Sequence, residues 1–312
     1  MPSPRTFTTL LPAILAFAIA CPSMASDRVT IKVSNDELIS YQATPLSTPK
    51  GGAAFQGSNF IHPLKTPSGF IVTDCQPDDH KHHFGLWWPW KFIQTGNRKI
   101  LCWELQKGDG LIQAAENAQI QNGLITKSIY IDRNAPDGAV TLLNETTIIT
   151  ASDILKQPTT GYFLDLKITQ QTESNTAITI PTHHYSGFSL RGTPAWHHDN
   201  STILTSEGKE RLTANFSHAR WVKVEGKTDS SEDAGIILMS HPTNQAHPEK
   251  LRTWDTQHKG AVFINFNTVA DKGWRFEPHR KYSRRYRAFV YDGQVSATET
   301  EVLWKTYAST AE

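Results

Sequence analysis

The chain has 312 residues, of which 38% are hydrophobic and 20% charged, so it has enough apolar side chain for a large core and is not a disordered polymer. A net charge of +1 excludes the basic surplus typical of proteins that bind nucleic acid or anionic membranes, and we expect neither partner. The sequence has no P-loop, dinucleotide-binding or serine-hydrolase signature, and we expect no cofactor.

Residues 1–25 have the pattern of a secretory signal peptide. Arg5 precedes the apolar run LLPAILAFAIA, and the triplet SMA at 23–25 places small residues at a cleavage site. We therefore expect export to the periplasm or the exterior, with 26–312 as the mature chain. A second interpretation takes Cys21 as the lipid-bearing residue of a lipoprotein signal. No later apolar run is long enough to span a bilayer, so no membrane segment is expected in the mature chain.

Beyond the leader, apolar and polar residues alternate with a period of two, which predicts β-strands. YFLDLKITQQ (162–171) places its apolar side chains on one face, and RRYRAFVYDG (284–293) repeats the pattern. Turn signals such as KTPSG at 65–69 and PDG at 136–138 separate the strands. Further strands are expected in 28–34, 69–75, 99–105, 123–131, 140–149, 175–185, 220–226, 235–240 and 260–267.

Residues 26–312 contain no linker and no internal repeat, and we expect a single all-β domain built as a large β-sandwich. One helix is predicted at the C-terminus, because Ser296 and Glu299 form a capping box and apolar residues between 303 and 307 can dock on a sheet. Sandwiches of this size are common among sugar-active proteins, and by that analogy we expect a galactose-mutarotase-like supersandwich.

Two cysteines follow the leader, Cys75 and Cys102. An exported compartment permits a disulfide between them, and two buried thiols fit the sequence equally well. Neither belongs to a CxxC pair, which argues against a thiolate zinc site.

The segment DDHKHHFGLWWPW (78–90) combines carboxylates, imidazoles and indoles. Such a mixture suits a sugar, because an aromatic face packs on the C–H side of a pyranose while polar groups bind its hydroxyls. A regular strand through HHFGLWW would send the adjacent His82 and His83 to opposite faces. The residues expected to stack on a sugar are Trp87, Trp88 and Trp90.

The same segment allows two other interpretations. Asp79, His80 and His82 are competent metal ligands, although their spacing matches no known signature. A structural aromatic cluster with solvated histidines is the other alternative.

A second segment, PTHHYSGFSLRGTPAWHHDN (181–200), repeats the paired histidines at His183 and His184. Two such pairs far apart in the sequence predict a shared site, because imidazole is the side chain best suited to acid–base work near neutral pH. Arg191 can hold a substrate in its planar fork, or it pairs with a neighbouring acid on the surface.

Two further stretches complete the expected site. Residues 240–260 form a predicted long loop that borders the same cleft and carries His241, Trp254 and His258. His258 is equally compatible with a solvated loop. Glu104 is a candidate general acid or base, or an ordinary exposed strand residue.

Four blocks, HPLKTPSGFIVTDCQPDDHKHHFGLWWPW, GFSLRG, ARWVKVEGKTDSSEDAGIILMSHPTNQAHP and YSRRYRAFVYDG, resemble the bacterial family named after methane oxygenase PmoA. The likeness spans about residues 55–310, and it implies an exported protein associated with sugar catabolism. His62 matches the central motif, whereas Phe84 stands where the family often has Arg. Methane oxidation itself is not expected, because that enzyme is a multi-helix membrane protein and this chain is β-patterned.

The leading hypothesis is an exported carbohydrate-active hydrolase, lyase or epimerase that uses acid–base catalysis. The expected catalytic residues are His82, His83, His183, Asp79 and Glu104, with Asp79 orienting an imidazole. The expected substrate-binding residues are Trp87, Trp88, Trp90, Arg191, His62, His184 and His241. The alternatives are a non-catalytic glycan-binding protein and a metal-dependent hydrolase or oxygenase that uses Asp79, His80 and His82.

Overall fold

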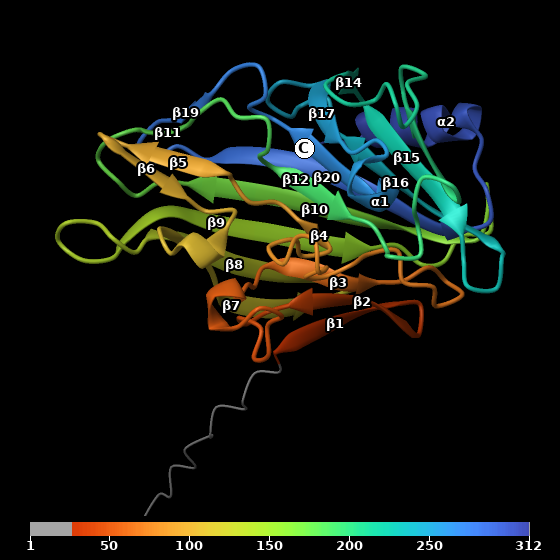
Figure 1. Ribbon diagram of the computed structural model, residues 1–312, viewed down its shortest axis with the longest axis horizontal. Helices are drawn as coiled ribbons and strands as arrows, with labels where there is room; N and C mark the ends of the chain where they lie inside the picture. Colours follow the sequence, from red (N-terminus) through yellow and green to blue (C-terminus); the bar gives the residue numbers. More distant parts are fainter. Residues whose placement is uncertain (1–26, 312) are drawn as a thin grey trace, which may run out of the picture.

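The computed structural model describes residues 27–311. The expected signal peptide and Cys21 lie outside the described residues. Two large antiparallel sheets pack face to face, and a smaller third sheet lies at one end of the molecule (Figure 1). The fold class expected from the sequence, an all-β sandwich with a C-terminal helix, is confirmed.

The first sheet has eight strands, and neighbours in its order are hydrogen-bonded. In spatial order they are β1 (Arg28–Val33), β2 (Asp36–Gln42), β3 (Phe60–Leu64), β4 (Leu86–Trp87), β12 (Phe188–Arg191), β18 (Phe263–Asn267), β17 (Glu249–Thr253) and β14 (His218–Ala219).

The second sheet also has eight strands, several of them longer than ten residues. In spatial order they are β13 (Ser201–Thr205), β15 (Trp221–Lys227), β16 (Asp233–Ser240), β20 (Tyr282–Asp292), β10 (Gly161–Gln171), β9 (Val140–Ala151), β8 (Gly123–Asp132) and β7 (Gly110–Ile120).

The remaining elements are short apart from one helix. The third sheet consists of β19 (Trp274–Phe276), β11 (Ile178–Ile180), β5 (Phe92–Thr95) and β6 (Arg98–Leu101). The helical elements are η1 (Ala53–Phe55), η2 (Leu105–Lys107), α1 (Gln257–Gly260) and α2 (Ala297–Ala308). Within residues 27–311, no helix combines the length and the apolar character needed to cross a bilayer.

The core lies between the first and second sheets, because each turns one apolar face inward. Leu164 and Leu166 of β10 pack in one buried cluster with Leu190 of β12 and Ile264 of β18. Fully burying a side chain of this size contributes about 1.5–3 kcal/mol to stability. The period-two pattern read from the sequence thus identifies the inward face of the long strands correctly.

The C-terminal helix α2 covers the outer face of the second sheet. Ser296 caps it as predicted: its Oγ accepts from Glu299 N at 3.2 Å, and its backbone N–H donates to Glu299 Oε2 at 2.8 Å. Trp304 and Tyr307 pack against apolar residues of β15, β16 and β20. The opposite outer face, on the first sheet, carries loops and the candidate site.

Three strand predictions differ from the structure. Residues 69–75 make only isolated bridges, such as Thr73 to Gly192, and 175–185 contains only the short β11. The predicted loop 240–260 contains β17, which pairs with β18. The charged residues of β17 do not have the pattern of a buried strand in the sequence. Glu249 is nevertheless fully buried, where it accepts hydrogen bonds from Ser240, Thr268 and Tyr286.

Both cysteines of the described chain are free thiols, so the structure decides against a disulfide. Cys102 is buried and Cys75 is half-buried. Burial raises the pKa of the Cys75 thiol to about 12, which leaves it unreactive at neutral pH.

Candidate functional site

The histidine-rich segment is a turn that leads into a two-residue strand. Backbone hydrogen bonds from His80 N to Pro77 O and from His83 N to His80 O close successive turns, and β4 begins only at Leu86. The predicted alternation from residue 82 is therefore wrong. His82 and His83 lie together, with ring centroids 4.9 Å apart.

From β4 onward the strand alternation holds. Leu86 points into the core, and Trp87 points to the outer face of the first sheet. Trp88 and Trp90 turn inward instead, where their indole N–H groups donate to Glu145 and Gln170. With 1% and 0% of their surface exposed, Trp88 and Trp90 cannot stack on a substrate, which corrects the prediction for both.

An aromatic cluster, defined as Trp87, Trp103, Tyr185, Trp254 and Phe263, lies on this outer face. The ring centroids of Trp87 and Trp103 are 5.4 Å apart, and those of Trp254 and Phe263 are 4.9 Å apart. The three indoles are only 2–4% exposed. Trp87 therefore supports the site from below and does not offer an open stacking face, which corrects its predicted role.

His83 is inserted into the aromatic cluster. Its ring lies 5.2 Å from that of Trp87 and 5.1 Å from that of Phe263, and only 2% of the residue is exposed. Burial lowers the pKa of His83 well below its usual range, so the ring is neutral. A side chain this enclosed holds its neighbours in place, and it has little access to a substrate.

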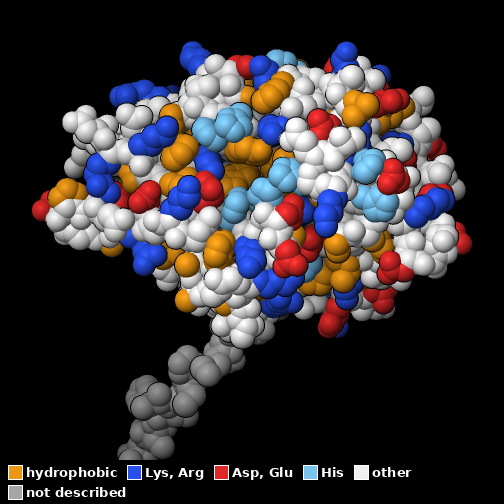
Figure 2. Space-filling view, in the orientation of Figure 1, with side chains coloured by type: hydrophobic (Ala, Val, Ile, Leu, Met, Phe, Trp, Pro, Cys, Tyr) orange, Lys and Arg blue, Asp and Glu red, His pale blue; other side chains and the backbone are white. Residues whose placement is uncertain are grey.

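Above the cluster stands an imidazole rim, defined as His80, His82, His183, His184 and His258. The ring centroids of His80 and His258 are 4.8 Å apart, and those of His80 and His82 are 5.4 Å apart. His183 stacks on His184 at 4.3 Å. Figure 2 shows histidines gathered around a hollow whose floor is apolar. The two histidine pairs are linked through the aromatic cluster, because His83 packs on Phe263 and His184 packs on Tyr185.

The rim is anchored to the aromatic cluster on two sides. His80 and His258 lie 4.8 and 4.1 Å from the ring of Trp254, and His184 lies 4.7 Å from the ring of Tyr185. Packed aromatic pairs at such distances contribute about 0.5–1.5 kcal/mol each. The imidazoles are therefore held in fixed positions.

Several buried polar atoms around the cluster lack a hydrogen-bond partner among residues 27–311. They are His83 Nδ1, Trp87 Nε1, Trp254 Nε1, and Nε and Nη1 of Arg191. A buried donor or acceptor without a partner costs about 1–3 kcal/mol. These five atoms lie around one hollow, where a polar ligand or ordered water can complete their hydrogen bonds.

Arg191 is itself buried and forms an ion pair with Asp79 at the surface, which is the alternative to substrate binding that the sequence left open. Arg191 Nη2 lies 2.8 and 3.0 Å from the two carboxylate oxygens, and the guanidinium lies over the ring of Trp254. Burial opposes ionisation of Asp79, but the charge of Arg191 outweighs it and the pKa of the carboxyl is lowered. Asp79 Oδ2 also accepts from His80 Nδ1 at 3.1 Å, so the imidazole that Asp79 orients is His80.

Glu104 is a half-buried residue on the far side of the rim. It pairs with Lys91, and the charge and hydrogen bond of that lysine outweigh burial and lower the pKa of the Glu104 carboxyl. Burial lowers the pKa of His82 to about 4, and the charge of Glu104 opposes that shift. His82 and Glu104 are therefore a neutral base and an ionised carboxylate that interact at neutral pH.

A cleft of about 870 Å³ adjoins the hollow at Asp79 and His258. His197, His198 and Asp199 from the second histidine segment also line this cleft. Asp74 also lines it, and burial raises the pKa of that carboxyl. The volume is in the range of small-molecule sites.

Two predicted residues fall outside this arrangement. His241 is buried beneath α2, where it contacts Tyr307 and Arg285, so its substrate-binding role is wrong. His62 lies on β3 and bonds to the hydroxyl of Thr73 at 3.0 Å, beside the turn at Gly85 and outside the aromatic cluster.

Two residues of the aromatic cluster were not predicted from the sequence. Trp103 immediately precedes Glu104 and Tyr185 immediately follows His184, but an isolated aromatic residue carries no signal of its own. The three metal-capable donors that the structure brings together are Asp79, His80 and His258, so His258 replaces His82 in the predicted set.

Comparison with known protein families shows which family the chain belongs to. Residues 28–305, from β1 to α2, match a model described as a family of unknown function, DUF6807. The chain belongs to the DUF6807 family. The match includes every residue of the aromatic cluster and of the imidazole rim. The resemblance to the PmoA family stays a prediction. No curated protein matches the sequence significantly.

Solved structures that resemble the chain include GH36 α-galactosidases from Geobacillus stearothermophilus. AgaA A355E D548N in complex with raffinose is 10% identical with a TM-score of 0.45, over 86% of this chain and 41% of that enzyme. AgaB is 8% identical with a TM-score of 0.44, over 86% and 40%. The DUF6807 chain thus spans about two fifths of the length of these enzymes.

Proposed function

We propose that the protein is an exported carbohydrate-active enzyme that acts on a sugar or glycoside by histidine and carboxylate acid–base chemistry. The observation that carries this proposal is the set of unpartnered buried polar atoms beneath a rim of imidazoles. A polyhydroxylated ligand can complete many hydrogen bonds at once, which suits a site with several polar groups.

We assign His82 the role of general base. Its pKa of about 4 keeps it neutral at pH 7, so it can accept a proton. The charge of the Glu104 carboxylate then favours the resulting imidazolium. His183, whose pKa burial also lowers to about 4, lies on the opposite part of the rim as a second neutral imidazole.

The charge states favour elimination or epimerisation over hydrolysis. Glycoside hydrolysis by two carboxyl groups needs one of them protonated. Asp79 and Glu104 both have lowered pKa values, so neither is a suitable acid. Abstraction of a proton from a sugar carbon next to a carbonyl or carboxyl group needs a positioned base, which is His82. The electron pair of the broken C–H bond moves onto that carbonyl or carboxyl oxygen, where a cationic group such as Arg191 would stabilise the enolate. Return of a proton to the carbon completes epimerisation, and loss of a substituent from the next carbon completes elimination.

Hydrolysis is a second candidate because of one observation in the cleft. Asp74 has a raised pKa while Asp79, on the same cleft, has a lowered one. Two carboxyl groups whose environments separate their pKa values are the usual pattern of an acid and its partner base.

The test is a panel of sugars and glycosides incubated with the mature protein in D2O and followed by NMR. Epimerisation incorporates deuterium at carbon, elimination produces an unsaturated sugar, and hydrolysis releases a reducing end without deuterium at carbon. We expect turnover to fall at least about 100-fold in His82→Gln. His218→Gln, an exposed imidazole paired with Asp271, is the matched control and should keep activity.

Two outcomes would contradict the enzyme proposal. Sugar binding without any product would indicate a glycan-binding protein, and no binding of any sugar would remove the carbohydrate assignment. If the wild type releases a reducing end without deuterium at carbon, and Asp74→Asn does not, the protein is a hydrolase, the second candidate.

We also propose export, on the pattern of residues 1–25. Mass spectrometry of the purified native protein should find an N-terminus at Ser26 or Asp27, or a lipid on Cys21.

A further inference from the structure

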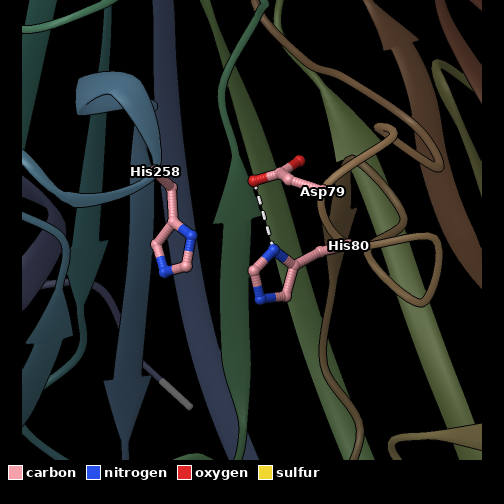
Figure 3. Close-up of side chains that lie close together, drawn as sticks. All are labelled: Asp79, His80 and His258. Atoms are coloured by element: carbon pink, nitrogen blue, oxygen red, sulfur yellow. Dashed lines mark hydrogen bonds and ion pairs between the residues drawn. The ribbon is translucent and has the colours of Figure 1, made fainter.

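We propose that Asp79, His80 and His258 bind a divalent transition-metal ion such as Zn²⁺. The donor atoms of these three side chains lie within 4.8 Å of one another. Asp79 and His80 come from the turn before β4, and His258 comes from α1, far along the chain. Figure 3 shows the two imidazoles standing side by side with the carboxylate beside His80.

The spacing of the donors suits one ion. Asp79 Oδ2 and His80 Nδ1 are 3.1 Å apart. Neighbouring ligands about 2.0–2.1 Å from a shared ion lie roughly 2.9–3.4 Å apart, so this pair can bind an ion in place of the proton that now joins it. His258 is exposed, and its donor nitrogen lies within 4.8 Å of the other two donor atoms, so its side chain must move closer to share the ion.

Packing holds the two imidazoles near this position before any ion binds. The His80 ring lies between those of His83, at 4.7 Å, and Trp254, at 4.8 Å. The His258 ring packs on Trp254 at 4.1 Å. A site arranged in advance loses less conformational entropy on binding, which favours affinity.

The donor set selects the class of ion. Two imidazoles and one carboxylate suit zinc, iron, cobalt or manganese, whereas Ca²⁺ and Mg²⁺ require more oxygen ligands. Three protein ligands leave coordination positions open, as catalytic metal sites do. Asp79 and His258 both line the 870 Å³ cleft, so an open position there can accept a ligand oxygen.

Arg191 sets a limit on affinity. Its Nη2 donates to both oxygens of Asp79 and orients the carboxylate. The positive charge of Arg191 also partly neutralises the carboxylate that the ion would bind. The ion therefore binds more weakly than it would to an unshared carboxylate. The rings of His80 and His82 are 5.4 Å apart, so if the proposed function also holds, an ion on His80 would lie on the same side of the site as the base and could polarise a sugar oxygen there.

The test is isothermal titration of the chelator-treated mature protein with ZnCl2 and then with MnCl2. Co²⁺ absorption spectra provide an independent report of the ligand geometry. We expect one Zn²⁺ per chain, with affinity at least about tenfold weaker in His258→Ala and in Asp79→Asn. His218→Ala should bind as the wild type does, because His218 pairs with Asp271 outside this cluster.

A second group of possible ligands also has donor atoms within 4.8 Å of one another: His197, His198 and Asp199. Variants of this group test whether the ion binds there instead. Loss of binding in His198→Ala alone, equal binding in His258→Ala and the wild type, or no stoichiometric Zn²⁺ in the wild type would each overturn the proposal. His258 is exposed, so its variant should keep the wild-type Tm and remain interpretable if Asp79→Asn is destabilised. Metal uptake without sugar turnover would refute the proposed function alone, and sugar turnover by a protein that binds no stoichiometric Zn²⁺ would refute the metal site alone.

Discussion

At the scale of single residues, the environment of His82 determines whether it can act as a base. Burial lowers the pKa of the ring to about 4, and the nearby Glu104 carboxylate limits the shift. Lys91 in turn keeps Glu104 ionised. The charges of Glu104 and Lys91, together with burial, therefore determine the pKa of His82.

This chain of interactions predicts the pH dependence of activity. Turnover should be nearly constant through neutral pH and decline as pH falls through about 4, where His82 becomes protonated. Glu104→Gln removes the charge that raises the pKa of His82, so the pKa should fall further and the acid limb should move to lower pH. NMR titration of the His82 ring measures this directly. An unchanged or higher pKa in the variant would contradict the assigned interaction.

At the scale of elements, the site depends on the sharp entry of the histidine segment into β4. Gly85 has φ +61, and a Cβ there would lie 2.4 Å from the carbonyl oxygen of Ile61 and 2.9 Å from Cβ of His62. Only glycine permits both the left-handed conformation and this close approach to β3. The turn therefore fixes where the strand begins and which indole faces outward.

Gly85→Ala should destabilise the fold more than Gly96→Ala. Gly96 has a similar φ of +52 but open space around its Cα, so alanine there costs only the left-handed conformation, about 1–2 kcal/mol. The backbone clash at Gly85 should add at least about 1 kcal/mol. Urea unfolding of the two variants measures the difference, and equal losses would mean that β3 can move aside.

At the scale of the whole molecule, burial of neutral imidazoles couples stability to pH. Four histidines in different parts of the sandwich have pKa values lowered to about 4 from an ordinary value of 6.5. They are His62, His82, His183 and His247. Between these two pH values the unfolded chain binds more protons than the folded chain, so acid favours unfolding.

The free energy of unfolding should therefore fall as pH drops from about 6.5 to about 4, before most carboxylates titrate. Denaturant unfolding at a series of pH values measures the slope. His247→Gln removes one of the four groups and should make the slope shallower by about one proton. A stability that is constant across this range would show that the rings are accessible to protons in the folded state.

Local patterns in the sequence were sufficient for the architecture. Alternation along β10 and β20 identified their buried faces, and the Ser296–Glu299 capping box located α2, because both depend only on neighbours within a few residues. The concentration of histidines in two segments also predicted a shared site, and in the structure both segments pack on the aromatic cluster.

Tertiary structure alone decided which side chains belong to the site. The strand β4 starts at Leu86, so Trp87 points outward, whereas Trp88 and Trp90 are buried. A period of two predicts that neighbouring residues face opposite sides, but it does not tell which side is buried unless the first residue of the strand is known. The grouping of His258 with Asp79 and His80 depends on contacts between segments far apart in the chain. Such contacts are set by how sheets and loops pack, and no local pattern in the sequence encodes them.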